Sequence, residues 1–145
     1  MQEPTGLEHM GCFALYSASR AITGLYRPVL DELGLTYPQY IAMIVIWQRG
    51  SVTVSDLGTA LALDSGTLSP LLKRLETRGL IRRERGVHDE RTVWISSTAQ
   101  GTELRARVHG IPERLACAID LTHDEFAQLL QLMSRIRVSA TTSTL

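Results

Sequence analysis

The chain has 145 residues, the length of one domain and enough to bury a core. Fifteen Lys and Arg balance fifteen Asp and Glu, and 44% of the residues are hydrophobic, so the composition excludes a disordered acidic or basic tail. The longest apolar run, about six residues from Ile41, is far shorter than the roughly 18 needed to cross a bilayer, and the first twenty residues lack a secretion-signal pattern, so we expect a soluble, cytoplasmic protein without a membrane partner.

Apolar residues recur at helical spacing from Cys12 to Leu33 and predict a long first helix, with Gly34 at a position where helices commonly end. Pro28 lies inside this pattern and has no backbone N–H for the hydrogen-bond ladder. We therefore expect a kink or a break near Tyr26.

A second helix is predicted between residues 36 and 50. Thr36 or Tyr37 is suited to cap its start, Pro38 fits the first turn, and Gly50 marks its end. Because most of the residues between them are apolar, we expect this helix to be buried.

The next segment predicts two short helices joined by a tight turn. Val52 and Val54 suit a short strand, and Ser55 or Thr53 is suited to cap the brief helix that follows. Residues 64–67, Asp-Ser-Gly-Thr, combine turn and cap residues and predict the start of the second helix.

The second helix of this pair is amphipathic. Apolar residues at positions i, i+3, i+4 and i+7 predict one buried face, formed by Leu68, Leu71, Leu72 and Leu75. Pro70 would disturb a helix that begins at Asp64, but it fits the first turn of one that begins near Gly66 or Thr67. The start therefore stays open by about two or three residues.

A hairpin is predicted next. Leu80–Arg85 and Thr92–Ser96 read as two short strands, with the turn at residues 86–89. In the second strand, Val93 and Ile95 share one face, and Thr92 and Trp94 share the other.

Two helices are predicted after the hairpin. Thr98 is suited to cap a long helix with a bend near Pro112, and its apolar stripe consists of Leu104, Val108, Ile111 and Leu115. A last helix follows Thr122, where Glu125 completes a capping box. The order of elements predicts a mainly α fold with a small β-hairpin (α+β), built as one unit of residues 1–145.

Basic residues are concentrated around the predicted hairpin. Seven of the fifteen Lys and Arg fall between residues 73 and 91, where four acidic residues leave a net charge of +3 in a neutral chain. Charge alone fits an ordinary solvated face as well as a nucleic-acid site. Helix-turn-helix followed by a basic hairpin, however, is the winged-helix arrangement, so residues 52–97 are predicted to form a DNA-binding lobe. The alternative is that helix and hairpin are simply core structure.

A winged helix places its second helix in the major groove, where polar and basic side chains of the N-terminal half reach bases and phosphates. The candidates here are Ser65, Thr67, Ser69, Lys73 and Arg74. Arg85 and Arg91 flank the hairpin turn, where a guanidinium can enter the minor groove. The predicted partner is double-stranded DNA.

Several motifs carry a resemblance to a known family. Residues 64–81 read DSGTLSPLLKRLETRGLI and residues 89–101 read DERTVWISSTAQG; they resemble the MarR family of winged-helix repressors. Residues 12–20 (CFALYSASR), 26–28 (YRP) and 35–40 (LTYPQY) are similar to its OhrR branch, which senses organic hydroperoxides.

The resemblance implies a homodimer that binds an inverted-repeat operator. In the family, the first and last helices join the subunits, which assigns this role to residues 8–34 and 98–138. Long apolar stripes at both ends of the chain agree with such a dimer, because a monomer of this length would struggle to cover them.

Two cysteines without a secretion signal are reduced thiols by default, often small buried hydrophobes. Cys12, however, lies at the predicted start of the first helix, where the helix dipole favours the thiolate that attacks a peroxide. Tyr26 and Tyr37 can donate phenolic hydrogen bonds to this anion, and the resemblance implies that they reach it across the dimer interface. Their alternative role is aromatic packing in the core.

Cys117 is predicted to lie within a helical segment, between Leu115 and Ile119. The resemblance to the two-cysteine form of OhrR implies that Cys117 of the partner condenses with oxidised Cys12, and that the disulfide releases the DNA. The alternative is that Cys117 is a buried residue without this role.

Other classes of function are less well supported. The four histidines show no metal-ligand spacing, the pair His9 and Cys12 is a weak zinc signal, and no catalytic motif is present, so we expect neither an enzyme nor a cofactor or metal. Two alternatives remain: a MarR-type repressor released by a reversibly bound small aromatic ligand, and an architectural DNA-binding dimer without a switch.

Overall fold

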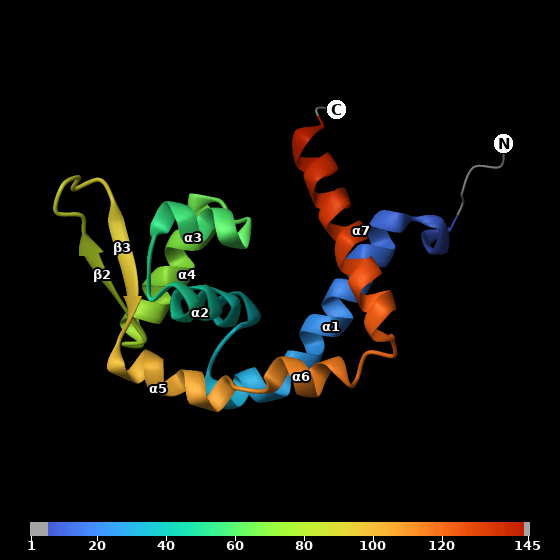
Figure 1. Cartoon of the computed structure of the whole chain (residues 1–145), viewed down its shortest axis with the longest axis horizontal. Coiled ribbons are helices and arrows are strands. Elements are labelled where there is room, and N and C mark those ends of the chain that lie inside the picture. The colour runs from blue at the N-terminus through green and yellow to red at the C-terminus, as the bar shows by residue number, and fades with distance from the viewer. Residues whose placement is uncertain (1–5, 144–145) are drawn as a thin grey trace. The chain divides into compact units, whose positions relative to one another are not determined.

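The computed structural model describes residues 6–143, in which helices predominate and three short strands form one sheet (Figure 1). The elements in chain order are η1 (Leu7–His9), α1 (Gly11–Leu33), α2 (Tyr37–Arg49), β1 (Ser51–Thr53), α3 (Val54–Leu61), α4 (Ser65–Thr77), β2 (Ile81–Arg85), β3 (Val93–Ser97), α5 (Ala99–Val108), α6 (Ile111–Ala116) and α7 (His123–Thr142). The expected fold class, mainly α with a small β-hairpin, is confirmed.

The chain forms two compact units. Among the described residues, the first comprises residues 6–111 and contains the helix-turn-helix α3–α4 and the sheet; the second comprises residues 112–143 and contains α7. The division lies close to Pro112, where the sequence predicted a bend.

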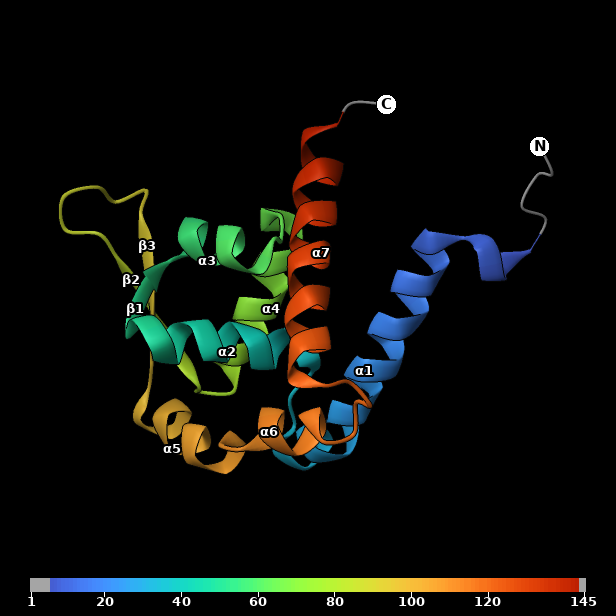
Figure 2. The ribbon, with the colours of Figure 1, turned by 45° about the vertical axis from the view of Figure 1, so that its right-hand side comes forward.

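The sheet is antiparallel with the strand order β1-β3-β2, so β1 joins the expected hairpin as a third strand. Its inner face carries Val52 and Ile95, which pair across β1 and β3 and are almost completely buried. Trp94, on the opposite face, is 41% exposed, as the alternation predicted. In Figure 2 the sheet lies beside α2, α3 and α4. The core between them contains Met43, Ile46, Leu57, Leu68, Leu72 and Leu75.

Side-chain caps define most helix starts. Thr36 accepts a hydrogen bond from the Gln39 backbone N–H, and the Gln39 side chain accepts one from the Thr36 N–H, so α2 begins with a capping box. Thr53, not Ser55, caps α3. Thr98 and Thr122 cap α5 and α7, as predicted, and the expected capping box with Glu125 is present in α7.

Of the kink or break expected near Tyr26, the break is absent: α1 continues through Pro28, and its ribbon changes direction along its length (Figure 1). Two other expectations about local structure need correction. Val54 is the first residue of α3 and not part of a strand. The predicted long helix after Thr98 is two helices, because Gly110 adopts φ +80° and interrupts the ladder between α5 and α6.

Gly101 fixes the crossing of α5 over the start of β2. A Cβ atom on Gly101 would lie 2.1 Å from the Leu80 carbonyl oxygen, which is far too close for any side chain. The indole N–H of Trp47 donates to the Gly101 carbonyl at 3.0 Å. This junction therefore attaches α5 firmly to α2 and to the sheet.

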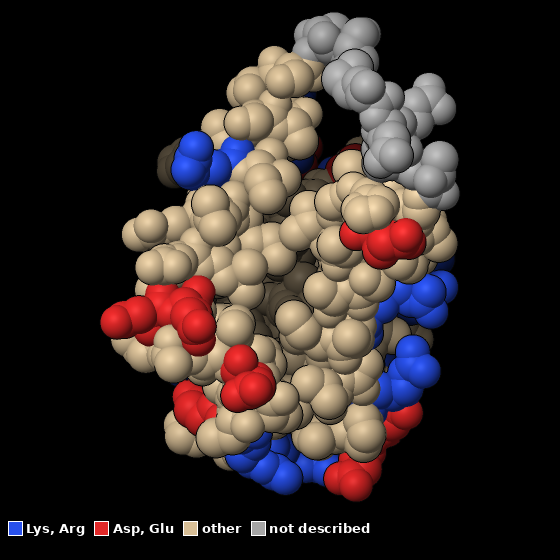
Figure 3. Space-filling model, turned by 90° about the vertical axis from the view of Figure 1, so that its right-hand side faces the viewer, with Lys and Arg blue, Asp and Glu red and all other residues tan. Residues whose placement is uncertain are grey.

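Two helices leave much of their apolar surface uncovered. Of the 23 residues of α1 only Leu30 and Leu33 are buried, and α7 buries none of its 20 residues. The exposed large side chains of α7 include Phe126, Leu130, Leu132, Met133, Ile136 and Val138. Most atoms on the face drawn in Figure 3 are uncharged.

Candidate functional site

Asp64 holds the turn between α3 and α4. Its Oδ1 accepts a hydrogen bond of 2.7 Å from the Thr67 backbone N–H, and this bond lowers the pKa of the Asp64 carboxyl below its ordinary value. Gly58 lets the chain turn tightly, because a Cβ there would lie 3.1 Å from the Leu63 carbonyl oxygen. The start of α4 is thus set locally by its own cap.

The helix α4 begins at Ser65, so Pro70 lies beyond its first turn. The sequence left this start open by about two or three residues, and the structure places it at Ser65, one residue before Gly66. A proline at this position removes the single hydrogen bond that residue 70 would donate to the Gly66 carbonyl, and α4 continues to Thr77 despite this loss.

The two faces of α4 divide as the sequence predicted. The four leucines are buried, and Leu72 and Leu75 have no exposed surface. The five candidate contact residues, Ser65, Thr67, Ser69, Lys73 and Arg74, are all exposed. Three of them, Ser65, Ser69 and Lys73, are spaced four residues apart and therefore follow one side of the helix.

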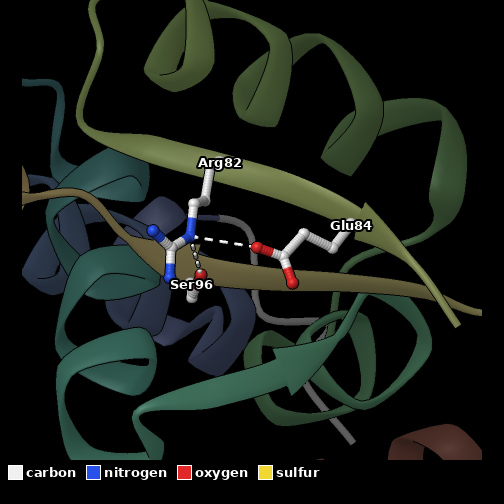
Figure 4. A network of polar contacts seen from close by, with 3 residues as sticks. All are labelled: Arg82, Glu84 and Ser96. Carbon is white, nitrogen blue, oxygen red and sulfur yellow. Dashed lines mark hydrogen bonds and ion pairs between the residues drawn. The ribbon is translucent and has the colours of Figure 1, made fainter.

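The basic cluster separates into two groups. Three arginines make structural contacts: Arg82 pairs with Glu84 at 3.2 Å and donates to Ser96 at 3.0 Å (Figure 4), Arg83 pairs with Glu76 at 2.9 Å, and Arg78 donates to backbone carbonyls. Within residues 6–143, the other four have no ion pair; they are Lys73, Arg74, Arg85 and Arg91, the four basic residues predicted to contact DNA.

The hairpin turn, hereafter the wing (residues 86–92), is held by its own backbone. Gly86 N–H donates to the Thr92 carbonyl at 2.8 Å, and Thr92 N–H donates to the Asp89 carbonyl at 3.1 Å. The Asp89 carboxylate accepts the Arg91 backbone N–H at 3.0 Å. A Cβ on Gly86 would lie 2.6 Å from the Asp89 carbonyl oxygen, so glycine is required there.

Arg91 also lines a groove of about 630 Å³ together with Ser65 and with Ser55 and Thr59 of α3. The wing arginine and the first residue of α4 therefore border the same surface. Hydroxyl groups and a guanidinium are groups that bind phosphate oxygens.

Cys12 is the second residue of α1, as expected, and its thiol is free and exposed. The first turn of α1 has no side-chain cap and no acidic residue. Its backbone N–H groups are therefore available to an anion at this end of the helix.

Tyr26 and Tyr37 lie in contact, with ring centroids 5.1 Å apart. Tyr40, which was not among the predicted site residues, completes the cluster: its ring centroid lies 5.7 Å from that of Tyr26 and 6.3 Å from that of Tyr37. Burial, and then the neighbouring Tyr37, raise the pKa of Tyr26, so its hydroxyl remains a hydrogen-bond donor at neutral pH.

The structure does not bring Cys12 to these tyrosines within one chain. Cys12 and Tyr26 belong to the same helix and are fourteen positions apart, which at about 1.5 Å per residue separates them by roughly 20 Å along α1. Any contact between the Cys12 thiol and a Tyr26 hydroxyl must therefore come from a second chain.

A groove of about 750 Å³ follows α1 and the start of α2. Its lining includes Phe13, Tyr16 and Tyr37 as well as Arg20 and Arg27. The Arg20 guanidinium lies 5.6 Å from the centroid of the Tyr16 ring, a cation–π distance. The helical spacing of Tyr16 and Arg20 was the available sequence signal for this groove.

Cys117 follows α6 in the second unit and is a free, exposed thiol. It lies in a turn and not inside the predicted helical segment, and its exposure in the single chain disagrees with the alternative of a buried Cys117. No cluster of three or more metal-ligating side chains occurs among the residues that the structure describes.

Comparisons with known proteins identify the group to which this arrangement belongs. Residues 24–108 match the family described as transcriptional regulator SarA/Rot. A mutant of MarR from E. coli, solved in complex with operator DNA, has the same fold, with a TM-score of 0.73 and 24% identity over 85% of this chain and 90% of that one. The organic hydroperoxide resistance transcriptional regulator of Bacillus subtilis is 44% identical over 130 residues, which are 90% of this chain and 86% of the relative. The chain belongs to the MarR family of winged-helix transcriptional regulators.

A further MarR-type neighbour is reduced AbfR bound to DNA, a protein of Staphylococcus epidermidis, with a TM-score of 0.77 and 28% identity over 90% of this chain and 89% of that one. These relatives are transcriptional regulators and not enzymes, so the MarR-type chain described here is a DNA-binding regulator. Within residues 6–143, no helix combines the length and hydrophobicity that a membrane span requires.

Proposed function

We propose that this MarR-type regulator is a homodimeric repressor, acting in the cytoplasm, that senses organic hydroperoxides through Cys12. The observation that carries the proposal is the exposed Cys12 thiol at the uncapped start of α1, in a chain 44% identical to an organic hydroperoxide resistance regulator. The start of a helix favours an anion, and the thiolate is the form of a cysteine that attacks a peroxide oxygen.

The uncovered apolar surfaces of α1 and α7 support the dimer, because such surfaces on a soluble domain are usually partner interfaces. In the dimer, Tyr26 and Tyr37 of one subunit hold the Cys12 thiolate of the other through their hydroxyl groups. The length of α1 favours this crossed arrangement over a contact within one chain.

The proposed reaction has two steps. The Cys12 thiolate attacks the hydroperoxide, the O–O bond breaks, and the products are a Cys12 sulfenic acid and an alcohol. The Cys117 thiol of the other subunit then attacks this sulfur, forming a disulfide and releasing water. The exposure of Cys117 supports its role as the second thiol.

The DNA partner is an operator with two half-sites related by the symmetry of the dimer. Ser65, Thr67, Ser69, Lys73 and Arg74 of α4 lie in the major groove. The wing, with Arg85 directly before it and Arg91 within it, reaches the minor groove. The absence of competing ion pairs at the four basic residues, among the described part of the chain, supports this assignment. The disulfide changes the separation of the two α4 helices, and the repressor leaves the DNA.

Substitution of Cys12 tests the sensing step. The variant Cys12→Ser is expected to bind operator DNA like the wild type and to remain bound after addition of an organic hydroperoxide, because no thiolate is left to react. Release is measured by fluorescence anisotropy of labelled operator, and covalent dimers by electrophoresis without reductant. Cys117→Ser is the matched control, which is expected to lose the covalent dimer but to keep the oxidation of Cys12. Release of Cys12→Ser by the hydroperoxide would refute thiol sensing.

The second candidate is a repressor released by a reversibly bound small aromatic ligand. It is favoured by the groove of about 750 Å³, which combines aromatic rings with Arg20 and Arg27. Release of both cysteine variants by such a ligand, with no response to hydroperoxide, would support this candidate.

A further inference from the structure

The C-terminal ends of α1 and α4 are joined by one side chain. Arg78 is the C-cap residue of α4, and its guanidinium donates hydrogen bonds to the carbonyl oxygens of Leu33, at 2.9 Å, and of Gly34. Leu33 is the last residue of α1 and Gly34 is its C-cap. The helix α4, which carries the proposed DNA contacts and is called the recognition helix below, is thus connected directly to α1, which carries Cys12. The two hydrogen bonds join residues 44 and 45 positions apart in sequence.

The two carbonyl groups are available because of the way α1 ends. Gly34 N–H donates to the Asp31 carbonyl and Leu35 N–H donates to the Leu30 carbonyl, so the last turn is closed by carbonyls further back in the helix. The carbonyls of Leu33 and Gly34 point away from the end of α1, which carries the negative pole of its dipole. The last turn of α1 has no basic residue of its own, and the compensating charge is supplied by α4.

The local structure is fitted to this contact. Gly34 has φ +65°, a conformation that favours glycine, and a Cβ atom on it would lie 3.0 Å from Nη2 of Arg78. On the other side, Gly79 has φ +71° and ends α4 directly after Arg78. Both helices therefore end on a glycine, and the guanidinium lies between the two ends.

Arg78 differs from the other members of the basic cluster in the kind of acceptor that its guanidinium contacts. Lys73, Arg74, Arg85 and Arg91 have no ion pair within the described residues, and Arg82 and Arg83 pair with carboxylates. Arg78 instead uses the planar fork of the guanidinium for two backbone acceptors, a directional contact that a lysine cannot reproduce.

We propose that Arg78 is a positioning residue for operator recognition: it holds α4 at a fixed angle to α1 and does not itself contact DNA. This inference rests on the proposed function in one respect, that two recognition helices of a dimer read two half-sites. Specific binding then requires that their separation match about one turn of DNA, whereas non-specific binding depends mainly on charge. Losing the contact therefore weakens specific binding selectively.

The test uses the full-length protein and two DNA duplexes: one that the wild type selects from a random pool, and one of scrambled sequence. The variant Arg78→Met is expected to bind the selected duplex about tenfold more weakly, the size expected for a lost hydrogen bond to a charged group. Its affinity for the scrambled duplex and the slope of log affinity against log salt concentration are expected to stay at the wild-type values, because no phosphate contact is removed.

Two control variants remove the same charge elsewhere in the cluster. Lys73→Met is expected to weaken binding to both duplexes and to reduce the slope of log affinity against log salt concentration by about one. The guanidinium of Arg82 contacts Glu84 and Ser96, so Arg82→Met is expected to change neither the affinity for either duplex nor the salt slope. Arg78→Lys keeps the charge but loses the fork, and is expected to lose specific affinity with an unchanged slope; it serves as the measurement if Arg78→Met does not fold.

Each result has a defined meaning. Selective loss of specific affinity at a constant salt slope supports the positioning role. Wild-type affinity in the Arg78 variants, or a parallel loss on both duplexes with a reduced slope, overturns it, since the second result would make Arg78 a phosphate contact. If the wild type selects no duplex, the proposed function fails and this inference fails with it. If the wild type selects a duplex and the Arg78 variants bind it with wild-type affinity, only this inference fails.

Discussion

Individual residues of the basic cluster have separate roles, although the sequence shows them as one block of charge. Arg82 and Arg83 stabilise the hairpin and its contact with α4, and Arg78 joins two helix ends. The remaining four basic residues have no such partners among the residues described. A count of charges could not make this distinction, because it depends on which carboxylates and carbonyls the fold brings near each side chain.

Arg91 provides a test at this scale. Arg91→Ala is expected to weaken operator binding by roughly 1–3 kcal/mol, the range for an arginine inserted into DNA. Anisotropy titration against the selected duplex measures the effect, and Arg82→Ala, which removes an arginine already engaged by Glu84, is the control. An affinity equal to that of the wild type would remove the wing from the proposed interface.

The cysteines and tyrosines show which properties of the candidate site could be predicted from the sequence and which could not. The sequence identified Cys12, Tyr26 and Tyr37, but it missed Tyr40, whose ring completes the cluster. Tyr40 lies one helical turn after Tyr37, and that spacing was the available signal. The exposure of Cys117 was not predictable because it depends on α6 ending at Ala116.

Among the elements, helix starts were the most predictable features. Four helices have a cap whose side chain accepts a hydrogen bond from the backbone N–H three residues later; the caps are Thr36, Asp64, Thr98 and Thr122. Each of these interactions depends on only four consecutive residues, so a local sequence pattern can predict it. The pairing of β1 with β3 joins residues more than forty positions apart, and no local pattern encodes it. The break between α5 and α6 had a local signal, Gly110, which the apolar stripe outweighed.

The cap of α4 leads to a prediction about pH. The folded-state pKa of Asp64 is lowered by its hydrogen bonds to Thr67, so its contribution to stability is present above the ordinary aspartate pKa of about 4 and is lost as the pH falls through the lowered value. Asp64→Asn keeps a capping oxygen without a titrating group and is expected to reduce the decline of the melting temperature on the acid side. Thermal unfolding followed by circular dichroism between about pH 6 and pH 2 measures this.

A matched variant separates the cap from other carboxylates. Asp56→Asn changes an acidic residue in the first turn of α3, where Thr53 supplies the cap. Its acid-side profile is expected to follow that of the wild type more closely than Asp64→Asn does. Identical profiles for Asp64→Asn and the wild type would contradict the role assigned to the Asp64 carboxylate.

For the whole molecule, the important observation is the amount of apolar surface left uncovered by a single chain. The 20 residues of α7 include no buried side chain, and Leu130 is 56% exposed. A helix with such a surface requires a partner to be stable in water. The sequence predicted uncovered apolar surface, because the apolar stripes at both ends of the chain are longer than a monomer of this length could cover.

Leu130 provides the test at this scale. Leu130→Asp places a charge in the proposed subunit interface and is expected to convert the dimer to a monomer and to abolish specific operator binding, because an unpaired buried charge is strongly unfavourable. Sedimentation velocity measures the mass. Gln131→Asp adds the same charge at the next residue of α7 and is expected to leave the dimer intact. A dimeric Leu130→Asp protein would exclude this surface from the interface.

Lys73 is the one lysine in the sequence, and it lies exposed on α4 among the proposed DNA contacts. A reagent that couples to side-chain amines therefore modifies this surface, and bound operator DNA is expected to shield Lys73 from it. The extent of labelling at this residue, read by mass spectrometry, would report operator occupancy without any engineered attachment point.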